Sequence, residues 1–236
     1  MEGDETRNDD ALTAAPAHGL RADAQRNRER ILVAARDVFV EQGPGAPLDA
    51  IATRAGVGNA TLYRRFPNRT ALMRAVALDV LARSASEARA ALAEEVDAFQ
   101  ALARYMHRAL DSRVAAVMSS LADQTAADDE VMRLRDGSAA AMQRLIETAQ
   151  GEGLLRPDVT FGDIGLLLVR LSRPLPEAIP KEVNDALGHR HLDFLLAGLR
   201  VSPGTGATSL PGPAMSLDDL RNLPTKEGDD CGTTDR

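Results

Sequence analysis

Cysteine and aromatic residues are scarce in this sequence of 236 residues, which has one cysteine, no tryptophan, two tyrosines and five phenylalanines. The single cysteine, Cys231, excludes an intrachain disulfide and fits a reducing cytoplasm, where we expect the protein to reside. No apolar run approaches the roughly 20 residues that a membrane-spanning helix needs, and the acidic N-terminus lacks a signal-peptide pattern. We therefore expect no membrane partner.

Sequence signatures of common catalytic sites are also missing. No GxGxxG, GxxxxGK[ST], GxSxG or HExxH segment occurs, which removes support for nucleotide, phosphate-loop, esterase and zinc-protease sites. His189 and His191 are two residues apart, so on a helix they point to different faces, and His107 stands alone. No set of nucleophile, base or metal ligands can be assembled. We expect no enzyme activity, no cofactor and no bound metal.

Negative charge predominates, with a formal net charge of −7, but it is distributed unevenly. Residues 1–20 carry five acidic residues against one arginine, and residues 201–236 carry six against three basic ones. In contrast, residues 21–75 hold ten arginines and five acidic residues. Residues 21–75, the head, therefore carry +5, and residues 76–200, the body, carry the remaining −5. A basic head joined to an acidic body indicates a nucleic-acid partner for the head.

Residues 48–66, LDAIATRAGVGNATLYRRF, have the punctuation of a helix-turn-helix motif. Gly56 stands where a helix C-terminus accepts a residue with positive φ, and Leu62 and Phe66 lie one helical turn apart beyond it. The preceding helix is marked by apolar residues at helical spacing, namely Leu48, Ile51, Ala52 and Ala55. This pattern predicts two short helices joined by a tight turn.

The second of these helices is too short to be stable alone, so Leu62 and Phe66 must hold it against a core. Its opposite side is small, polar and basic: Asn59, Ala60, Thr61, Tyr63, Arg64 and Arg65. A helix fits the major groove of B-DNA, where small residues allow close approach to bases and the long ones reach phosphates. From spacing alone, the alternative is an ordinary helical hairpin with a solvated basic face.

Within about residues 25–75 the sequence closely resembles the N-terminal domain of TetR-family transcriptional regulators. The matching positions are Arg30-Ile31-Leu32, Ala35, Phe39, Gly43, Ile51-Ala52, Ala55-Gly56-Val57, Thr61-Leu62-Tyr63, Phe66 and Leu72. The resemblance implies an all-α, homodimeric protein of about nine helices. Pro47, Gly58 and Asn59 depart from the family pattern, which often has a Ser/Thr cap, a serine and a lysine there. Compared with the family pattern, the sequence therefore lacks one hydroxyl and one cation that would lie near the phosphates of bound DNA.

Two flanking segments add candidate DNA contacts. Arg28 lies in a basic cluster at the start of the first helix, which is either a solvated helix start or a contact with the phosphate backbone or a minor groove. Asn68 is a good N-cap for a longer helix, whose first turn places Arg69 beside the preceding helix. We expect Arg28 and Arg69 to contact DNA, and this longer helix to link head and body mechanically.

The charge and composition pattern divides the chain into four segments. We predict a disordered acidic tail over residues 1–20, a helix-turn-helix DNA-binding domain over 21–67, a helical ligand-binding and dimerisation domain over 68–200, and a disordered tail over 201–236. Helices in the third segment are predicted near residues 68–92, 95–111, 113–124, 128–150, 161–173 and 184–199.

The last two predicted helices differ from the rest: the segment from Phe161 to Leu171 is apolar on nearly every side, and large apolar residues crowd the final helix. A helix that is apolar all round must be buried on several faces. Burial inside the monomer is one explanation. The other follows from the resemblance, which implies that this helix pair forms a four-helix interface with its symmetry mate. The candidate interface residues are Ile164, Leu168, Leu171, Leu192, Leu195 and Leu199.

The resemblance also implies a small-molecule pocket between the body helices. Candidate lining residues, each of which would also suit an ordinary core, are Leu102, Met106, Met118, Leu121, Met142, Leu145 and Ile146. Because the body has few aromatic residues, a modest aliphatic or polar effector is favoured over a flat cationic one.

The sequence therefore predicts a ligand-responsive transcriptional repressor that binds a palindromic operator in double-stranded DNA as a homodimer. One alternative is an activator or a regulator without a ligand. Another is a helical protein-interaction module whose head lacks DNA affinity, given Gly58 and Asn59.

Overall fold

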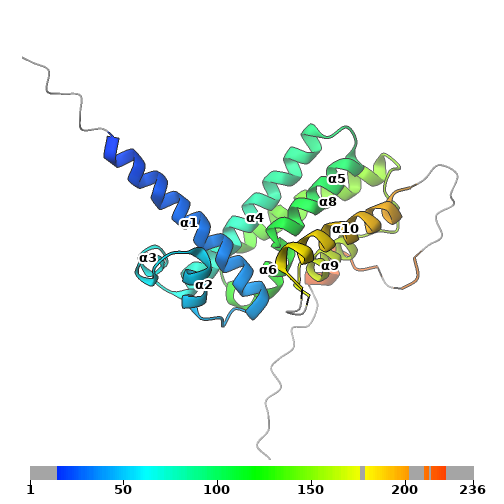
Figure 1. The fold of residues 1–236 in the computed structure, drawn as a ribbon. Coiled ribbons are helices and arrows are strands. Elements are labelled where there is room, and N and C mark those ends of the chain that lie inside the picture. Colours follow the sequence, from blue (N-terminus) through cyan, green and yellow to red (C-terminus); the bar gives the residue numbers. More distant parts are fainter. Residues whose placement is uncertain (1–14, 176–178, 202–209, 213, 222–236) are drawn as a thin grey trace, which may run out of the picture. The chain divides into compact units, whose positions relative to one another are not determined.

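Helices make up nearly all of the described chain. The computed structural model describes residues 15–175, 179–201, 210–212 and 214–221. Within these ranges there are eleven helices, and the only β pairing is an isolated bridge between Leu155 and Arg200. The all-α prediction is confirmed. The helices (Figure 1) are α1 (Ala15–Gln42), α2 (Leu48–Ala55), α3 (Asn59–Arg65), α4 (Arg69–Glu94), α5 (Ala98–Ser112), α6 (Val114–Ser120), α7 (Ala122–Thr125), α8 (Asp129–Gly151), α9 (Phe161–Leu171), α10 (Lys181–Leu199) and α11 (Leu217–Arg221).

These helices form two compact units. One comprises the described residues up to Ala82 together with Ala116–Leu134, and the other comprises Arg83–Ala115 with the described residues from Arg135 onward. Helices α4 and α8 therefore each contribute residues to both units. This grouping differs from the predicted boundary at residue 67. None of the helices in the described ranges is both long and apolar enough to cross a membrane.

Ion pairs and a hydrogen bond explain why residues 116–134 belong with the head. Arg74 Nε lies 2.6 Å from Asp128 Oδ2, and the same guanidinium pairs with Glu130. Ser120 Oγ donates to the Phe39 carbonyl oxygen at 2.9 Å. The first unit therefore combines α1–α3, the first half of α4 and the α6–α8 segment through contacts between residues far apart in sequence.

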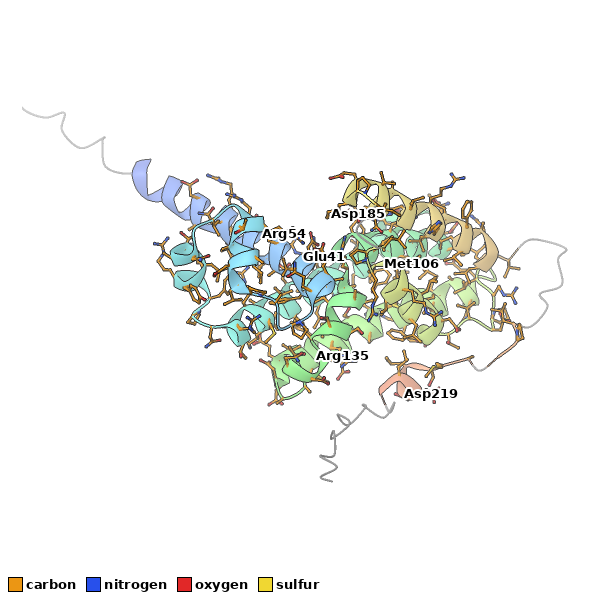
Figure 2. The ribbon with its side chains drawn as sticks, turned by 60° about the horizontal axis from the view of Figure 1, so that its bottom comes forward. Glu41, Arg54, Met106, Arg135, Asp185 and Asp219 are labelled. Carbon is orange, nitrogen blue, oxygen red and sulfur yellow. The ribbon has the colours of Figure 1, made fainter. Side chains whose placement is uncertain are left out.

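Helix α2 ends as predicted at Gly56, which has a left-handed backbone (φ 61°, ψ 40°) and donates its N–H to the Thr53 carbonyl at 3.0 Å. A side chain there would be strained by this φ. Its Cβ would also lie 2.5 Å from Nη2 of Arg30, which donates to the Gly56 carbonyl oxygen at 2.9 Å. Arg54 of α2 and Glu41 of α1, labelled in Figure 2, form a 2.5 Å ion pair. Glycine at the turn and two arginines thus fix α2 against α1.

The helix that follows the motif begins as predicted. The Asn68 side-chain oxygen accepts the Ala71 N–H at 2.8 Å, which satisfies one of the unpaired donors in the first turn of α4.

In the second unit, α5, α9 and α10 pack against one another (Figure 1). Helix α5 buries one apolar face, while α9 and α10 bury Leu168 and Leu192, respectively. Gly188 of α10 lies at the crossing, where a Cβ would be in ordinary contact with the Leu110 side chain and the Leu171 carbonyl oxygen. Gly188 therefore lies where α10 packs against Leu110 of α5 and Leu171 of α9.

The single helix predicted over residues 113–124 is wrong. Arg113 has a left-handed backbone (φ 51°) and ends α5, and Leu121 separates α6 from α7. Glycine is the usual sequence sign of a left-handed helix end, but here a nearly buried arginine occupies that position and pairs with Asp185 at 3.2 Å.

Ordered structure also extends into both predicted tails. Helix α1 begins at Ala15, inside the segment 1–20, and α11 lies inside the segment 201–236. Reciprocal hydrogen bonds between Ser216 and Asp219 (labelled in Figure 2) cap α11, and Gly162 of α9 donates to the Met215 carbonyl at 2.9 Å. Residues 1–14 and most of the C-terminal tail lie outside the described residues.

Candidate nucleic-acid interface

Helix α3 divides into a buried and an exposed side, as its sequence predicts. Leu62 is fully buried, and Phe66, at the C-cap, is also in the core. On the other side Tyr63 is 48% exposed, and the remaining exposed residues are Asn59, Ala60, Arg64 and Arg65, with Thr61 half-buried. The short helix is therefore held by two apolar residues while its polar and basic side faces solvent.

Not all exposed residues of α3 are equally available for a partner. Tyr63, Arg64 and Arg65 make no hydrogen bond or ion pair to another described side chain. Asn59 Nδ2 instead donates to Asp49 Oδ1 at 3.1 Å and so joins the first turns of α3 and α2. Three unpartnered long side chains, two of them cationic, leave α3 ready for an anionic surface.

The basic cluster of α1 also separates into engaged and available residues. Arg26 pairs with Asp23 on the same helix, and Arg30 is held by the Gly56 carbonyl. Arg28 is half-buried and has no partner among the described residues. Arg28 is thus the arginine in this described cluster whose full guanidinium remains free to meet a phosphate.

Arg69 has a structural role that the sequence pattern does not indicate. Its half-buried Nη1 donates to the carbonyl oxygens of Pro44, at 2.9 Å, and Ala46. These bonds hold the loop between α1 and α2 against the first turn of α4. Because a guanidinium has five N–H donors, Arg69 retains further donors, but its removal would also disturb the head.

The candidate pocket residues in the body are all buried, but they do not belong to one unit. Leu102, Met106, Met142 and Leu145 lie in the second unit, whereas Met118 and Leu121 lie in the first. Ile146 borders a hollow of about 440 Å³, whose other walls come from α8, residues 157–161 and residues 216–218. Those other walls were not among the residues predicted from the sequence.

A buried group of three hydroxyls lies in the second unit, and nothing in the sequence indicates it. Ser138 Oγ donates to Ser84 Oγ at 2.9 Å, and Ser84 Oγ lies 3.0 Å from the Tyr105 hydroxyl. Burial raises the pKa of Tyr105, although its hydrogen bonds with the two serines act in the opposite direction. Helices α4, α5 and α8 each contribute one hydroxyl, so only the fold brings them together.

The six candidate interface residues on α9 and α10 fall into two groups. Ile164, Leu168 and Leu192 are almost completely buried within the monomer. Leu171 and Leu199 are half-buried, and Leu195 is 37% exposed. Other exposed apolar residues on these two helices are Leu166, Val183 and Phe194. The exposed apolar side of α10 therefore includes residues beyond the predicted six.

The arrangement of the histidine and acidic side chains bears on metal binding and on one further contact. Among the described residues, no group of three or more His, Cys, Asp or Glu side chains is arranged to hold a metal ion. His107, which stood alone in the sequence, lies beside His189 with 2.8 Å between their Nδ1 atoms.

Sequence comparison identifies two matching family profiles. Residues 31–76 match "Bacterial regulatory proteins, tetR family", and residues 97–201 match "Transcriptional regulator SbtR-like, C-terminal domain". The first match covers α2, α3 and parts of the flanking helices, and the second covers the helices from α5 to α10.

Known proteins show the same relationship. The TetR transcriptional regulator SCO0520 of Streptomyces coelicolor is 33% identical, with 73% of this chain and 98% of that chain covered and a TM-score of 0.51. LfrR of Mycobacterium smegmatis, solved in complex with proflavine, is 26% identical over 72% of this chain and 96% of its own, with a TM-score of 0.52. The uncharacterized HTH-type regulator TtgW of Pseudomonas putida is 45% identical over 56 residues, which are 23% of this chain and 42% of TtgW. The chain thus spans less than half the length of this curated relative.

Proposed function

Because the chain belongs to the TetR family and is a DNA-binding transcriptional regulator, we propose that it acts in the cytoplasm as a ligand-responsive repressor that binds a palindromic operator as a homodimer. One observation carries the proposal: α3 is held by Leu62 and presents Tyr63, Arg64 and Arg65 without partners. A family of transcription factors also leaves no role for enzyme activity.

On DNA, the side chains of α3 divide by reach. Ala60 and Thr61 are short and lie in the first turn of the helix, which suits close approach to base edges. Tyr63, Arg64, Arg65 and, from α1, Arg28 have the length and hydrogen-bond donors for phosphates. Asn59 and Arg69 already bond within the head, so we assign them to holding the motif in shape and to secondary contacts.

The homodimer is supported by the exposed apolar residues of α10. Phe194 is 61% exposed and Leu195 37% exposed, and adjacent apolar side chains on a helix surface favour burial against a partner. We propose that the dimer interface, here called the seam, is formed by Phe194 and Leu195 on this side of α10, with the half-buried Leu171 of α9 and Leu199 of α10 beside them. Two heads joined in this way suit half-sites about one helical turn of DNA apart.

The buried hydroxyls of Ser84, Tyr105 and Ser138 support a proposal for the chemistry of the effector. These three hydroxyls hydrogen-bond with one another inside an otherwise apolar part of the second unit, and each hydroxyl can both donate and accept. Buried apolar residues of the same unit, Leu102 and Met142 among them, belong to the same helices. We propose a largely aliphatic effector with one polar group that exchanges a hydrogen bond with these hydroxyls. The proflavine bound by LfrR supports a small-molecule effector but differs in chemistry, since this body has few aromatic residues.

Helix α4 gives the effector a route to the head. Ser84 of α4 belongs to the hydroxyl group, and the same helix carries Arg69 and Arg74, which bond within the head unit. A shift of α4 caused by the effector would therefore reach the loop before α2 and the 116–134 segment. The coupling must be reciprocal: operator DNA should weaken effector binding by the factor by which the effector weakens DNA binding.

The experiment that tests DNA recognition is selection from random duplexes with the full chain, followed by binding of the enriched site at several salt concentrations. We expect an inverted repeat and an affinity that falls steeply with salt. Thr61→Ala should change the enriched sequence. If no duplex is enriched, the alternative of a helical interaction module without DNA affinity is favoured.

A reporter gene placed behind the enriched site separates repressor from activator. We expect lower transcription with the protein present, and higher transcription would indicate an activator. A small-molecule screen for recovered transcription then tests the effector. A compound that acts on the wild type but not on Tyr105→Phe would support the hydroxyl group as its site, and failure of the full screen favours a ligand-independent regulator.

A further inference from the structure

A line of polar residues joins α5 to α10 in the second unit, and two histidines lie at its centre. His107 Nδ1 and His189 Nδ1 are 2.8 Å apart. The two imidazole rings are nearly coplanar, at 16°, and their centroids are 5.1 Å apart. The centroid separation exceeds the distance between the nitrogens by about two ring radii, so the rings meet edge to edge and the two nitrogens point at each other.

The outer nitrogen of each histidine is fixed by a carboxylate. His107 Nε2 lies 3.0 Å from Asp193 Oδ1, and His189 Nε2 lies 2.9 Å from Asp111 Oδ1. An ionised carboxylate only accepts hydrogen bonds, so both Nε2 atoms must carry a proton. If both rings were neutral, their two Nδ1 lone pairs would face each other without a donor.

We propose that His107 and His189 share one additional proton, so that an imidazolium Nδ1–H donates to the neutral Nδ1 of the other ring and clamps α10 to α5. The distance supports a proton over a metal ion. A zinc–nitrogen bond is about 2.0 Å long, so a metal between two opposed nitrogens would need them about 4 Å apart. The positive charge of the shared proton is compensated by Asp111 and Asp193.

The clamp is complete in only one protonation state. With one proton fewer, one of the three hydrogen bonds is broken, because no tautomer of two neutral rings satisfies both carboxylates and the central contact. With one proton more, two N–H groups oppose each other at the centre. The two steps belong to the pair and not to either histidine alone. The link between α5 and α10 should therefore be strongest at intermediate pH.

The surrounding charges do not replace this proton. Arg108 of α5 lies 3.7 Å from Asp111. Asp185 of α10, labelled in Figure 2, pairs with Arg113, which follows α5, and with Lys181 of its own helix. On α10 itself, Arg190 lies over the Phe194 ring and His191 is exposed. On α9, which packs on both helices, Asp163 caps its own helix, while Arg170 and the following Arg173 are exposed. The two histidines and their two carboxylates therefore form the proton-sensitive centre.

The consequence is a pH-sensitive attachment of α10. Asp193 lies between Leu192, which is buried in the monomer, and the exposed Phe194 and Leu195. Proton loss or gain at the clamp would loosen the helix that carries those exposed residues. The clamp itself lies within one chain and holds whether or not α10 forms the dimer interface.

The direct test is NMR of the full chain with ¹⁵N-labelled histidine. We expect a scalar coupling between Nδ1 of His107 and Nδ1 of His189 across the shared hydrogen bond near neutral pH, and its loss at both acidic and alkaline pH. His191→Gln is the matched control on the same helix, and it should keep the coupling. Independent titration of the two rings without coupling would overturn the proposal.

Thermal unfolding across pH provides a second measurement. We expect the Tm of the wild type to pass through a maximum, and His107→Phe and His189→Phe to lower that maximum by about 3–10 °C and flatten it. The double variant should lose clearly less than the sum of the two single variants, because both single variants remove the same shared bond. A Tm that rises with added Zn²⁺ and falls with chelator would show a metal in place of the proton and would overturn the proposal. An identical profile in His191→Gln and His189→Phe would do so as well.

Discussion

Helices α3 and α10 both expose side chains that suit a binding partner, but the side chains are of opposite kinds: polar and basic on α3, and apolar on α10. Helix α3 buries Leu62 and exposes tyrosine and two arginines. Helix α10 buries Leu192 and exposes Phe194 and Leu195. The exposed side of each helix matches a different surface: a polyanion for α3 and an apolar surface for α10.

This difference shows how far exposure can be used to assign a partner. Charged side chains are common on protein surfaces, so exposure alone does not assign a partner to the arginines of α3. The assignment depends on their place in a helix-turn-helix motif and on their lack of partners among the described side chains. Adjacent exposed apolar side chains are less common and indicate a partner without any motif. The following predictions test the two assignments, from the largest expected effect to the smallest.

The largest effect should come from the buried side of the seam helices. Leu192→Glu and Leu168→Glu would each place a carboxylate at a position that is at most 2% exposed in the monomer. Burying an unpaired charge costs several kcal/mol, so both variants should unfold or lose most of their stability. Circular dichroism with urea titration measures this. A fully stable Leu168→Glu monomer would return Leu168 to the interface.

Leu195→Glu should separate the subunits without unfolding them. Leu195 lies three residues from Leu192 but is exposed, so a carboxylate there stays hydrated in the monomer and is buried only in the dimer. Light scattering should give the monomer mass with unchanged helicity, and operator affinity should fall because the half-sites bind separately. Ala197→Glu, at an exposed position of the same helix, is the control. An intact Leu195→Glu dimer would move the seam away from this side of α10.

Arg64→Ala and Arg65→Ala should weaken DNA binding on every sequence. For every phosphate that an arginine no longer neutralises, the slope of log affinity against log salt should become shallower by about 0.9. Arg89→Ala changes the net charge equally at an exposed position in the other unit and should leave the slope unchanged. The slopes come from fluorescence anisotropy at several salt concentrations. Equal slopes in all three variants would show that α3 does not meet the phosphates.

The smallest effect concerns the segment beside α9. The Arg156 guanidinium and the Leu210 N–H lower the pKa of Asp158 to about 2. Since the folded value lies below the ordinary one near 3.9, the ionised carboxylate stabilises the fold above pH ~4, and this contribution is lost as pH falls towards 2. Acid unfolding followed by fluorescence of a dye attached at Cys231 should begin at higher pH in Asp158→Asn. An unchanged acid transition would show that the Asp158 bonds do not hold the segment.

Features governed by neighbouring residues could be predicted from the sequence, and those governed by distant ones could not. Gly56, Asn68 and the two sides of α3 depend on residues within one or two turns, and the structure has them as predicted. The contact between His107 and His189 joins residues 82 positions apart, so only the packing of α10 on α5 creates it.

The seam residues show a different limit. A helix that is apolar on nearly every side does not reveal which side meets its own chain, because each side has the same residue type. Leu168 and Leu195 are therefore equivalent in sequence pattern, although one is buried in the monomer and the other is exposed. Arg69 shows a related limit, because charge alone does not distinguish a phosphate from the nearby carbonyl oxygens that its guanidinium meets.

The backbone contact between Gly162 and Met215 has a practical consequence for handling the protein. A Cβ at residue 162 would lie 2.2 Å from the Met215 carbonyl oxygen, so the C-terminal segment fits against α9 only because this residue is glycine. Thr160 donates to the same oxygen at 2.8 Å. Truncation after Val201 would remove both bonds and expose the first turn of α9. Affinity tags are therefore better added beyond the last residue, and crystallisation is better attempted with residues 210–221 retained.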